Sequence, residues 1–208
     1  TFSQGLVLGA IVQGVTLDDG RFVGGMFEWL TPFSFVVGCA MVWGYVLLGS
    51  TWMIIKTEGE LLEWARRVGM ISAAVVLLMM AVVSFWVPAL DAAAADRWGL
   101  RYPDVDWAKL LPLTPIPLLV VVAFWKLVTS LRKDTTYAPH IWASSLFLLG
   151  FIGLMVGINP YLVPYGLTIH EAAAAPKSQS LLLVGAVIML PIILGYTAYV
   201  YWIFRGKV

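Results

Sequence analysis

Uncharged apolar runs alternate with short charged segments along the whole chain. Five runs contain no Asp, Glu, Lys or Arg, and their lengths approach or exceed the roughly 20 residues that a helix needs to cross a bilayer. They are residues 29–55, 68–90, 110–125, 141–169 and 178–204. A shorter uncharged run, residues 1–17, is a sixth candidate. The pattern predicts an all-α, polytopic transmembrane helix bundle with five full spans and a partial N-terminal span.

The hydrophobic pattern within these runs, and the residues at their ends, indicate helices rather than barrel strands. The runs are continuously apolar, whereas membrane strands alternate over about 10 residues. Thr31 followed by Pro32 has the N-cap and first-turn pattern of a helix start. Pro112, Pro115 and Pro117 crowd the start of the third full span, where a first helical turn tolerates proline.

Composition excludes a water-soluble globular protein. Of the 208 residues, 61% are hydrophobic and 12% are charged, against about 45–50% and about 25% in soluble domains. The predicted spans use more than half of the chain, which leaves no room for a soluble catalytic domain of ordinary size. We therefore interpret residues 1–208 as a single transmembrane bundle. Because the chain starts at Thr1 without Met or a signal peptide, we expect it to be a fragment of a longer protein.

Basic residues in the loops predict the orientation, because Lys and Arg are retained on the cytoplasmic side of a membrane. Five basic residues fall on the predicted outer side, namely Arg21, Arg97, Arg101, Lys109 and Lys177. Eight fall on the other side, namely Lys56, Arg66, Arg67, Lys126, Arg132, Lys133, Arg205 and Lys207. This bias places the C-terminus in the cytoplasm.

Residues that could bind metals or nucleic acid are scarce. The net charge of +1 disfavours a nucleic-acid partner, which needs clustered Lys and Arg. Cys39 is the single cysteine, so the chain can form neither an intrachain disulfide nor a multi-Cys metal site. His140 and His170 flank one predicted span at opposite ends and cannot share a metal. Either could be a haem ligand alone, but we expect capping or interfacial roles, and we predict no catalytic, cofactor-binding or metal-binding residue in this chain.

Deep positions in the spans carry no ionisable side chain, and Lys126 is the nearest exception. Proton pumps and ion-coupled transporters normally keep such groups within the membrane. Small residues four apart instead allow helices to approach closely. Gly5 with Gly9 and Gly153 with Gly157 have this spacing, and we predict that they form a helix-packing interface.

Two loops outside the spans admit more than one interpretation. The segment 91–109 carries Trp98, Tyr102 and Trp107, which fits either a surface loop anchored at the lipid headgroups or a quinol-binding lid. Asn159 and Pro160 break the fourth full span before His170, which fits either an ordinary helix end or a binding crevice.

Several stretches, in order along the chain, resemble subunit II of the cytochrome bd quinol oxidases. Their sequences are most similar to the cyanide-insensitive type. They are Phe2-Ser3-Gln4-Gly5, Gln13-Gly14, Trp29-Leu30-Thr31-Pro32-Phe33, Lys56-Thr57-Glu58-Gly59-Glu60-Leu61, Trp142-Ala143-Ser144-Ser145, Pro160-Tyr161-Leu162-Val163-Pro164, and the stretch from Leu190 to Tyr199. The resemblance covers the C-terminal portion of the subunit. The family's N-terminal helices, with their Trp-Asp-Gly-Asn segment, have no counterpart here.

The resemblance implies a subunit of a terminal oxidase in the prokaryotic cell membrane that oxidises quinol and reduces dioxygen to water. In that family subunit I carries the haems of b and d type and the quinol-oxidising loop, so this chain is expected to bind no cofactor and to serve assembly, with subunit I, membrane lipid and quinone as partners. The family commonly has Trp where this chain has His170, before an acid that matches Glu171. A permease-like protein and a stand-alone membrane haem protein using His140 or His170 are the alternatives.

Overall fold

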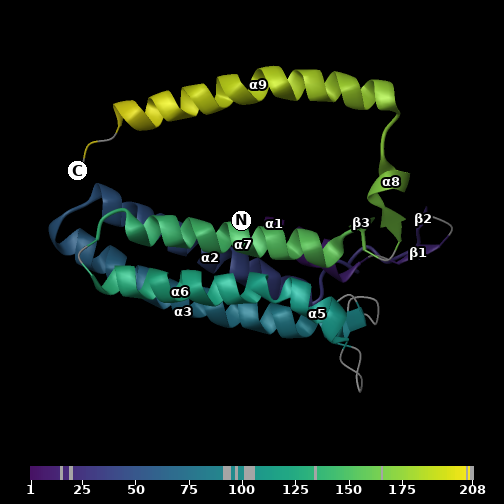
Figure 1. Cartoon of the computed structure of the whole chain (residues 1–208), viewed down its shortest axis with the longest axis horizontal. Helices are drawn as coiled ribbons and strands as arrows, with labels where there is room; N and C mark the ends of the chain where they lie inside the picture. Colours follow the sequence, from purple (N-terminus) through teal and green to yellow (C-terminus); the bar gives the residue numbers. More distant parts are fainter. Residues whose placement is uncertain are drawn as a thin grey trace.

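In the computed structural model, residues 1–14, 16–18, 21–90, 95–96, 98–100, 106–133, 135–164, 166–204 and 206 are described, and helices dominate them (Figure 1). The helices are α1 (Phe2–Gln13), α2 (Pro32–Lys56), α3 (Gly59–Leu90), α5 (Trp107–Leu113), α6 (Pro115–Arg132), α7 (Ala138–Ile158), α8 (Ile169–Ala172) and α9 (Pro176–Ile203).

Five helical segments of the described chain are long and apolar enough to cross a membrane: α2, α3, α5 with α6, α7 and α9. The shorter apolar helix α1 precedes them. The predicted fold class, with five full spans and a partial N-terminal span, is confirmed. The predicted span over residues 141–169 is too long, because α7 already ends at Ile158.

In the part of the chain that the structure describes, two short antiparallel hairpins interrupt the helices. Strand β1 (Leu17–Asp18) pairs with β2 (Arg21–Phe22), with Leu17 opposite Phe22. Strand β3 (Tyr161–Val163) pairs with β4 (Leu167–Thr168) between α7 and α8, with Tyr161 opposite Thr168 and an irregular register at Val163. Both hairpins link apolar helices and add almost no sheet to the fold.

The predicted start of α2 is confirmed in detail. The Thr31 hydroxyl accepts from the Ser34 backbone N–H at 3.0 Å, and the Ser34 hydroxyl oxygen accepts from the Thr31 N–H at 2.9 Å. This reciprocal capping satisfies N–H groups that lack partners within the helix. Further along, the proline cluster divides the third full span, since α5 ends at Leu113 and α6 begins at Pro115.

Four helices form the bundle, with α2 against α3, α3 against α6, α6 against α7, and α7 against α2. The main core lies between them and includes Leu47, Leu127 and Ala143, each with 0% of its surface exposed. Helix α1 packs on α2 and closes a smaller core around Phe33. In a bilayer, lipid would keep these apolar side chains away from water even if the helices were apart. Close packing between the helices, and not the hydrophobic effect, therefore stabilises the bundle.

Helix α9 lies apart from the other spans. Figure 1 shows it running alongside the bundle and joined to it through α8, with a clear separation along its length. None of its residues is buried, and large apolar side chains such as Leu182, Ile193 and Leu194 are exposed around it. Within this chain, α9 is therefore held by its two ends.

Candidate functional site

Gly5 and Gly9 lie on the face of α1 that contacts α2. A Cβ atom at Gly5 would lie 2.6 Å from the Gly38 Cα, and one at Gly9 would lie 2.5 Å from the Ser34 Cα. Both distances are far below an ordinary carbon contact, so the two backbones have come as close as glycine permits. The close packing that these glycines provide here is between two helices of this chain.

A hydrogen bond between side chains closes the same interface. The Thr31 hydroxyl donates to the Gln13 Oε1 at 2.7 Å, which joins the last residue of α1 to the cap of α2. The residue types that carry the family resemblance at Gln13 and Thr31 thus meet in space, although 18 positions separate them.

Gly153 and Gly157 occupy a looser part of the bundle, towards the end of α7. A Cβ at Gly153 would meet the Ile116 Cγ2 at 3.6 Å, which is an ordinary contact. A Cβ at Gly157 would meet no described atom within 4 Å. There is room on this face for a side chain, and a packing role for the pair towards another subunit stays a prediction.

Buried hydroxyl groups in the spans are satisfied by their own helices. Ser50 and Thr51 donate to the Leu47 carbonyl oxygen at 3.0 and 2.9 Å. Ser72 donates in the same way to the Val68 carbonyl at 2.8 Å. These bonds meet the requirement that polar groups in hydrocarbon find partners.

His140 lies in the first turn of α7 against the end of α2. Its Nδ1 is 3.1 Å from the Thr51 Oγ1, and its ring meets the Trp52 ring edge to face at 5.3 Å between centroids. Trp52 makes a second edge-to-face contact, also at 5.3 Å, with Tyr201 of α9. His140 thus makes a hydrogen bond and a ring contact between helices, and its expected capping or membrane-interface role stays a prediction.

His170 and Glu171 belong to the short helix α8 outside the spans. Glu171 Oε2 accepts from the Thr168 N–H at 2.9 Å and from the Thr168 hydroxyl at 2.8 Å. The Glu171 N–H donates back to the Thr168 hydroxyl. The Thr168 backbone N–H first, and its hydroxyl second, hold the pKa of the Glu171 carboxyl below its ordinary value. His170 is exposed beside this cap.

This cap predicts a pH dependence. Since the pKa of Glu171 is lower in the folded chain, the charged cap is fully present above the ordinary pKa and is lost as pH falls through the lowered one. Replacing Thr168 by Val removes one of the two donors, so the pKa should rise part of the way to its ordinary value. A titration of ¹³C-labelled Glu carboxyl groups by NMR, in wild type and in Thr168→Val, measures this. An unchanged Glu171 pKa in Thr168→Val would contradict the assignment.

The two histidines do not fit a haem held between two imidazoles. His140 is at the start of α7, and His170 lies beyond its end in α8. A helix of 21 residues is about 30 Å long, far more than one iron can span. Among the residues that the structure describes, no group of three or more His, Cys, Asp or Glu side chains could hold a metal ion.

Two cations bind carbonyl groups at the C-terminal ends of other helices. The Arg66 guanidinium, from the start of α3, donates to the Leu131 carbonyl at 3.1 Å and to the Lys133 carbonyl at the end of α6. The Lys56 ammonium, at the end of α2, donates to the Phe204 carbonyl and, at 3.3 Å, to the Gly206 carbonyl beyond α9. A positive charge at a helix C-terminus binds unpaired carbonyls and favours the helix dipole.

These contacts place the predicted cytoplasmic cations Lys56, Arg66 and Lys133 at one end of the bundle. Arg205 and Lys207 lie outside the described residues. The side of the membrane that this end faces stays a prediction.

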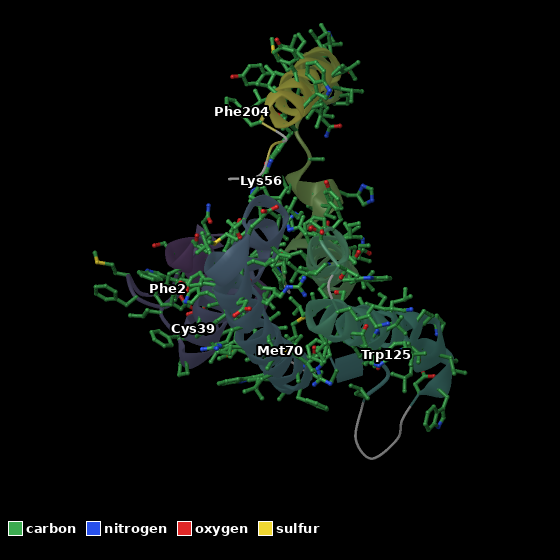
Figure 2. The ribbon with its side chains drawn as sticks, turned by 90° about the vertical axis from the view of Figure 1, so that its left-hand side faces the viewer. Phe2, Cys39, Lys56, Met70, Trp125 and Phe204 are labelled. Atoms are coloured by element: carbon green, nitrogen blue, oxygen red, sulfur yellow. The ribbon has the colours of Figure 1, made fainter. Side chains whose placement is uncertain are left out.

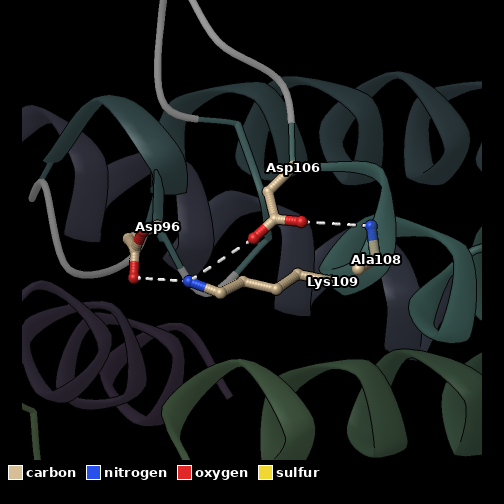
Figure 3. A network of polar contacts seen from close by, with 4 residues as sticks. All are labelled: Asp96, Asp106, Ala108 and Lys109. Carbon is tan, nitrogen blue, oxygen red and sulfur yellow. Dashed lines mark hydrogen bonds and ion pairs between the residues drawn. The ribbon is translucent and has the colours of Figure 1, made fainter.

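At the opposite end, Lys109 joins two acids near the start of α5 (Figure 3). Its Nζ lies 2.8 Å from Asp96 Oδ2 and 3.9 Å from Asp106 Oδ2. Asp106 also caps α5 by accepting from the Ala108 N–H at 3.1 Å. Each charged side chain is about half exposed, so the ion pairs contribute little stability. Tyr102, part of the suggested quinol lid, lies outside the described residues.

The sequence did not predict that His140 and Tyr201 both contact Trp52. These residues come from three helices, and 149 positions separate the first from the last. The only local signal was the presence of amphipathic rings near helix ends, where Trp and Tyr commonly lie at headgroup depth. That signal marks depth in the membrane and does not identify neighbours.

Comparison with known proteins assigns a relationship to nearly the whole chain. The model of the family described as cytochrome bd terminal oxidase subunit II matches residues 1–204. The cytochrome bd-I ubiquinol oxidase subunit 2 of Escherichia coli strain K12 is 25% identical over 232 aligned residues, covering 98% of this chain. A probable cytochrome oxidase subunit 2 of Haemophilus influenzae is 25% identical over 225 residues, covering 95%. The chain spans only 61% and 59% of the length of these two relatives.

Proposed function

We propose, from the premise that this chain belongs to the cytochrome bd terminal oxidase subunit II family, that it acts as a structural and assembly subunit of a membrane quinol oxidase. The complex would oxidise quinol and reduce dioxygen to water, as an enzyme of the respiratory chain. The family match over residues 1–204 is the observation that carries the proposal. The chain itself is an integral membrane protein with five apolar spans.

The arrangement of polar groups supports an assembly role over a catalytic one. Ser50, Thr51 and Ser72 donate to carbonyls of their own helices, and the two histidines lie too far apart to share one haem. We therefore propose that subunit I of the oxidase holds the haems of b and d type and the quinol site. Membrane lipid and quinone would surround this chain, with its C-terminus in the cytoplasm of a prokaryotic cell.

Co-purification with redox spectroscopy tests the proposal. A tagged chain taken from its native membrane should carry a second subunit, and the pair should show reduced-minus-oxidised haem bands. The chain expressed alone should show none. His140→Ala and His170→Ala should leave every haem band of the assembled complex in place. Bands in the isolated chain would instead favour a stand-alone haem protein, and the loss of one band in either variant of the intact complex would show that this chain ligates a haem.

Assembly should depend on the loose face of α7. Ile at both Gly153 and Gly157 would fill the room that the structure leaves there and hold a neighbouring subunit away, since association in lipid relies on close packing. We expect the yield of complex to fall about fivefold or more, with near-normal quinol oxidation per haem in the remainder. Normal yield would mean that lipid covers this face. Normal yield with lost turnover would indicate a direct catalytic role.

A further inference from the structure

A cavity of about 450 Å³, largely open to its surroundings, is lined by Trp52 of α2, His140 of α7 and Tyr201 of α9. The Trp52 ring contacts both other rings edge to face and so joins the residues that line the cavity. The volume is within the roughly 300–1,000 Å³ of sites that bind small molecules. The three rings offer apolar faces, and the imidazole and phenol also offer hydrogen-bonding groups.

The positive charge of Lys56 lies beside this cavity, and no carboxylate of the described residues forms an ion pair with it. The Lys56 Nζ is 5.5 Å from the centroid of the Trp52 ring and donates to the Phe204 and Gly206 carbonyls. Figure 2 shows Lys56 next to Phe204, between the bundle and α9. Two of the three ammonium protons are thereby used. The remaining proton and the full charge are available to an anion.

Tyr201 and the helix that carries it, α9, supply a hydrogen-bond donor and an apolar surface. Within the described chain the Tyr201 hydroxyl makes no hydrogen bond, although it lines the cavity. Tyr201 lies near the end of α9, whose apolar side chains are exposed around the whole helix. In a bilayer, hydrocarbon is the natural neighbour of such a surface. Polar groups at one end and an apolar helix leading away from them match an amphiphile.

We propose that this cavity binds the phosphate headgroup of an anionic phospholipid, with Lys56 and Tyr201 as polar contacts and the acyl chains along α9. The phosphate oxygens accept from the ammonium and the phenol, while Trp52 covers the glycerol region at headgroup depth. Basic pockets between helices at a membrane surface are suited to anionic headgroups. The acyl chains would lie along the part of α9 between its two ends, where none of its residues is buried. The inference does not depend on the oxidase function.

Native mass spectrometry of the purified chain measures the binding of the first lipid directly. Dioleoyl phosphatidylglycerol and dioleoyl phosphatidylcholine are titrated separately against wild type, Lys56→Gln, Lys56→Arg and Lys126→Gln. Lys126 is the matched control, since its Nζ also lies over a tryptophan, 5.3 Å from the Trp125 ring centroid, but away from the cavity. Gln at position 56 removes the charge and keeps an N–H donor, although its reach is one atom shorter than that of Lys. Far-UV circular dichroism checks that the fold is kept.

We expect Lys56→Gln to weaken phosphatidylglycerol binding about fivefold, the factor that corresponds to the attraction of one Lys for an anionic membrane surface. Phosphatidylcholine binding should be unchanged, and Lys56→Arg and Lys126→Gln should match wild type. Tyr201→Phe should weaken phosphatidylglycerol binding about two- to tenfold, as the loss of one hydrogen bond predicts. Inorganic phosphate in excess should not displace the lipid, because it lacks acyl chains.

Four results would overturn the proposal. An equal loss in Lys126→Gln would show general surface electrostatics, and an unchanged affinity in both Lys56→Gln and Tyr201→Phe would show that the cavity is not the site. Displacement by inorganic phosphate would identify an anion site without lipid. Displacement of phosphatidylglycerol by a neutral quinone, equally in wild type and Lys56→Gln, would identify an uncharged amphiphile as the occupant.

Discussion

Replacing Gly9 by Ile should detach α1 from α2 and lower the free energy of unfolding by about 3 kcal/mol, the upper part of the range for overpacking. A Cβ at this position would lie 2.5 Å from the Ser34 Cα and 3.1 Å from the Val37 Cβ. The first of these atoms is backbone within α2, so no side-chain rotation relieves the clash. Ile is a better helix former than Gly, so any loss must come from packing.

Titration with SDS in lipid micelles, followed by circular dichroism, measures this loss. Gly157→Ile is the matched control, because it makes the same change of side chain on a helix where the new Cβ meets no described atom within 4 Å. It should leave the free energy of unfolding of the isolated chain within about 0.5 kcal/mol of wild type, as for surface substitutions. If Gly9→Ile also unfolds like wild type, α1 does not pack on α2 in the membrane.

The glycine spacing shows what one sequence can and cannot specify. Four-residue separation identified both Gly5 with Gly9 and Gly153 with Gly157 as candidates for close packing, but the spacing is a property of one helix. The neighbour depends on which helices the loops bring together. Gly9 meets the backbone of Ser34, whereas Gly157 has room beside it, and nothing within either helix distinguishes the two cases.

The spans themselves were predictable because bilayer thickness dictates their length. The start of α2 at Pro32 was predictable too, since Thr31 carries its own capping chemistry. The end of α7 was missed because the criterion was charge. The residues after Ile158 are uncharged, so the criterion could not detect the change from helix to the β3–β4 hairpin. The backbone break at Asn159 and Pro160 was the better signal.

The position of α9 was also beyond sequence reasoning. Its apolar composition predicts a span equally well whether it lies inside a bundle or beside it, because lipid and core side chains are alike in polarity. The contacts that hold its end, Lys56 with Phe204 and Trp52 with Tyr201, join residues 148 and 149 positions apart. Only the folded arrangement brings them together.

Arg66→Ala should lower the free energy of unfolding by about 2 kcal/mol, because hydrogen bonds from a charged group contribute roughly 1.5–3 kcal/mol and this side chain is only half buried. The guanidinium binds carbonyls of Leu131 and Lys133 and, at 3.5 Å, that of Thr135. These carbonyls end α6 and begin the link to α7, so their loss should fray the end of α6 first. Hydrogen exchange at the amides of α6 would show faster exchange confined to its last turn.

Arg67 provides the matched control for this prediction, since it is the next residue on α3 and its side chain is exposed. Arg67→Ala should change stability by less than about 0.5 kcal/mol, although it removes the same charge. Arg66→Lys should fall between wild type and Arg66→Ala, because an ammonium keeps the charge at the helix end but lacks the planar fork that reaches several carbonyls together. Equal losses in Arg66→Ala and Arg67→Ala would show that net charge at this end, and not the capping of α6, is what stabilises the bundle.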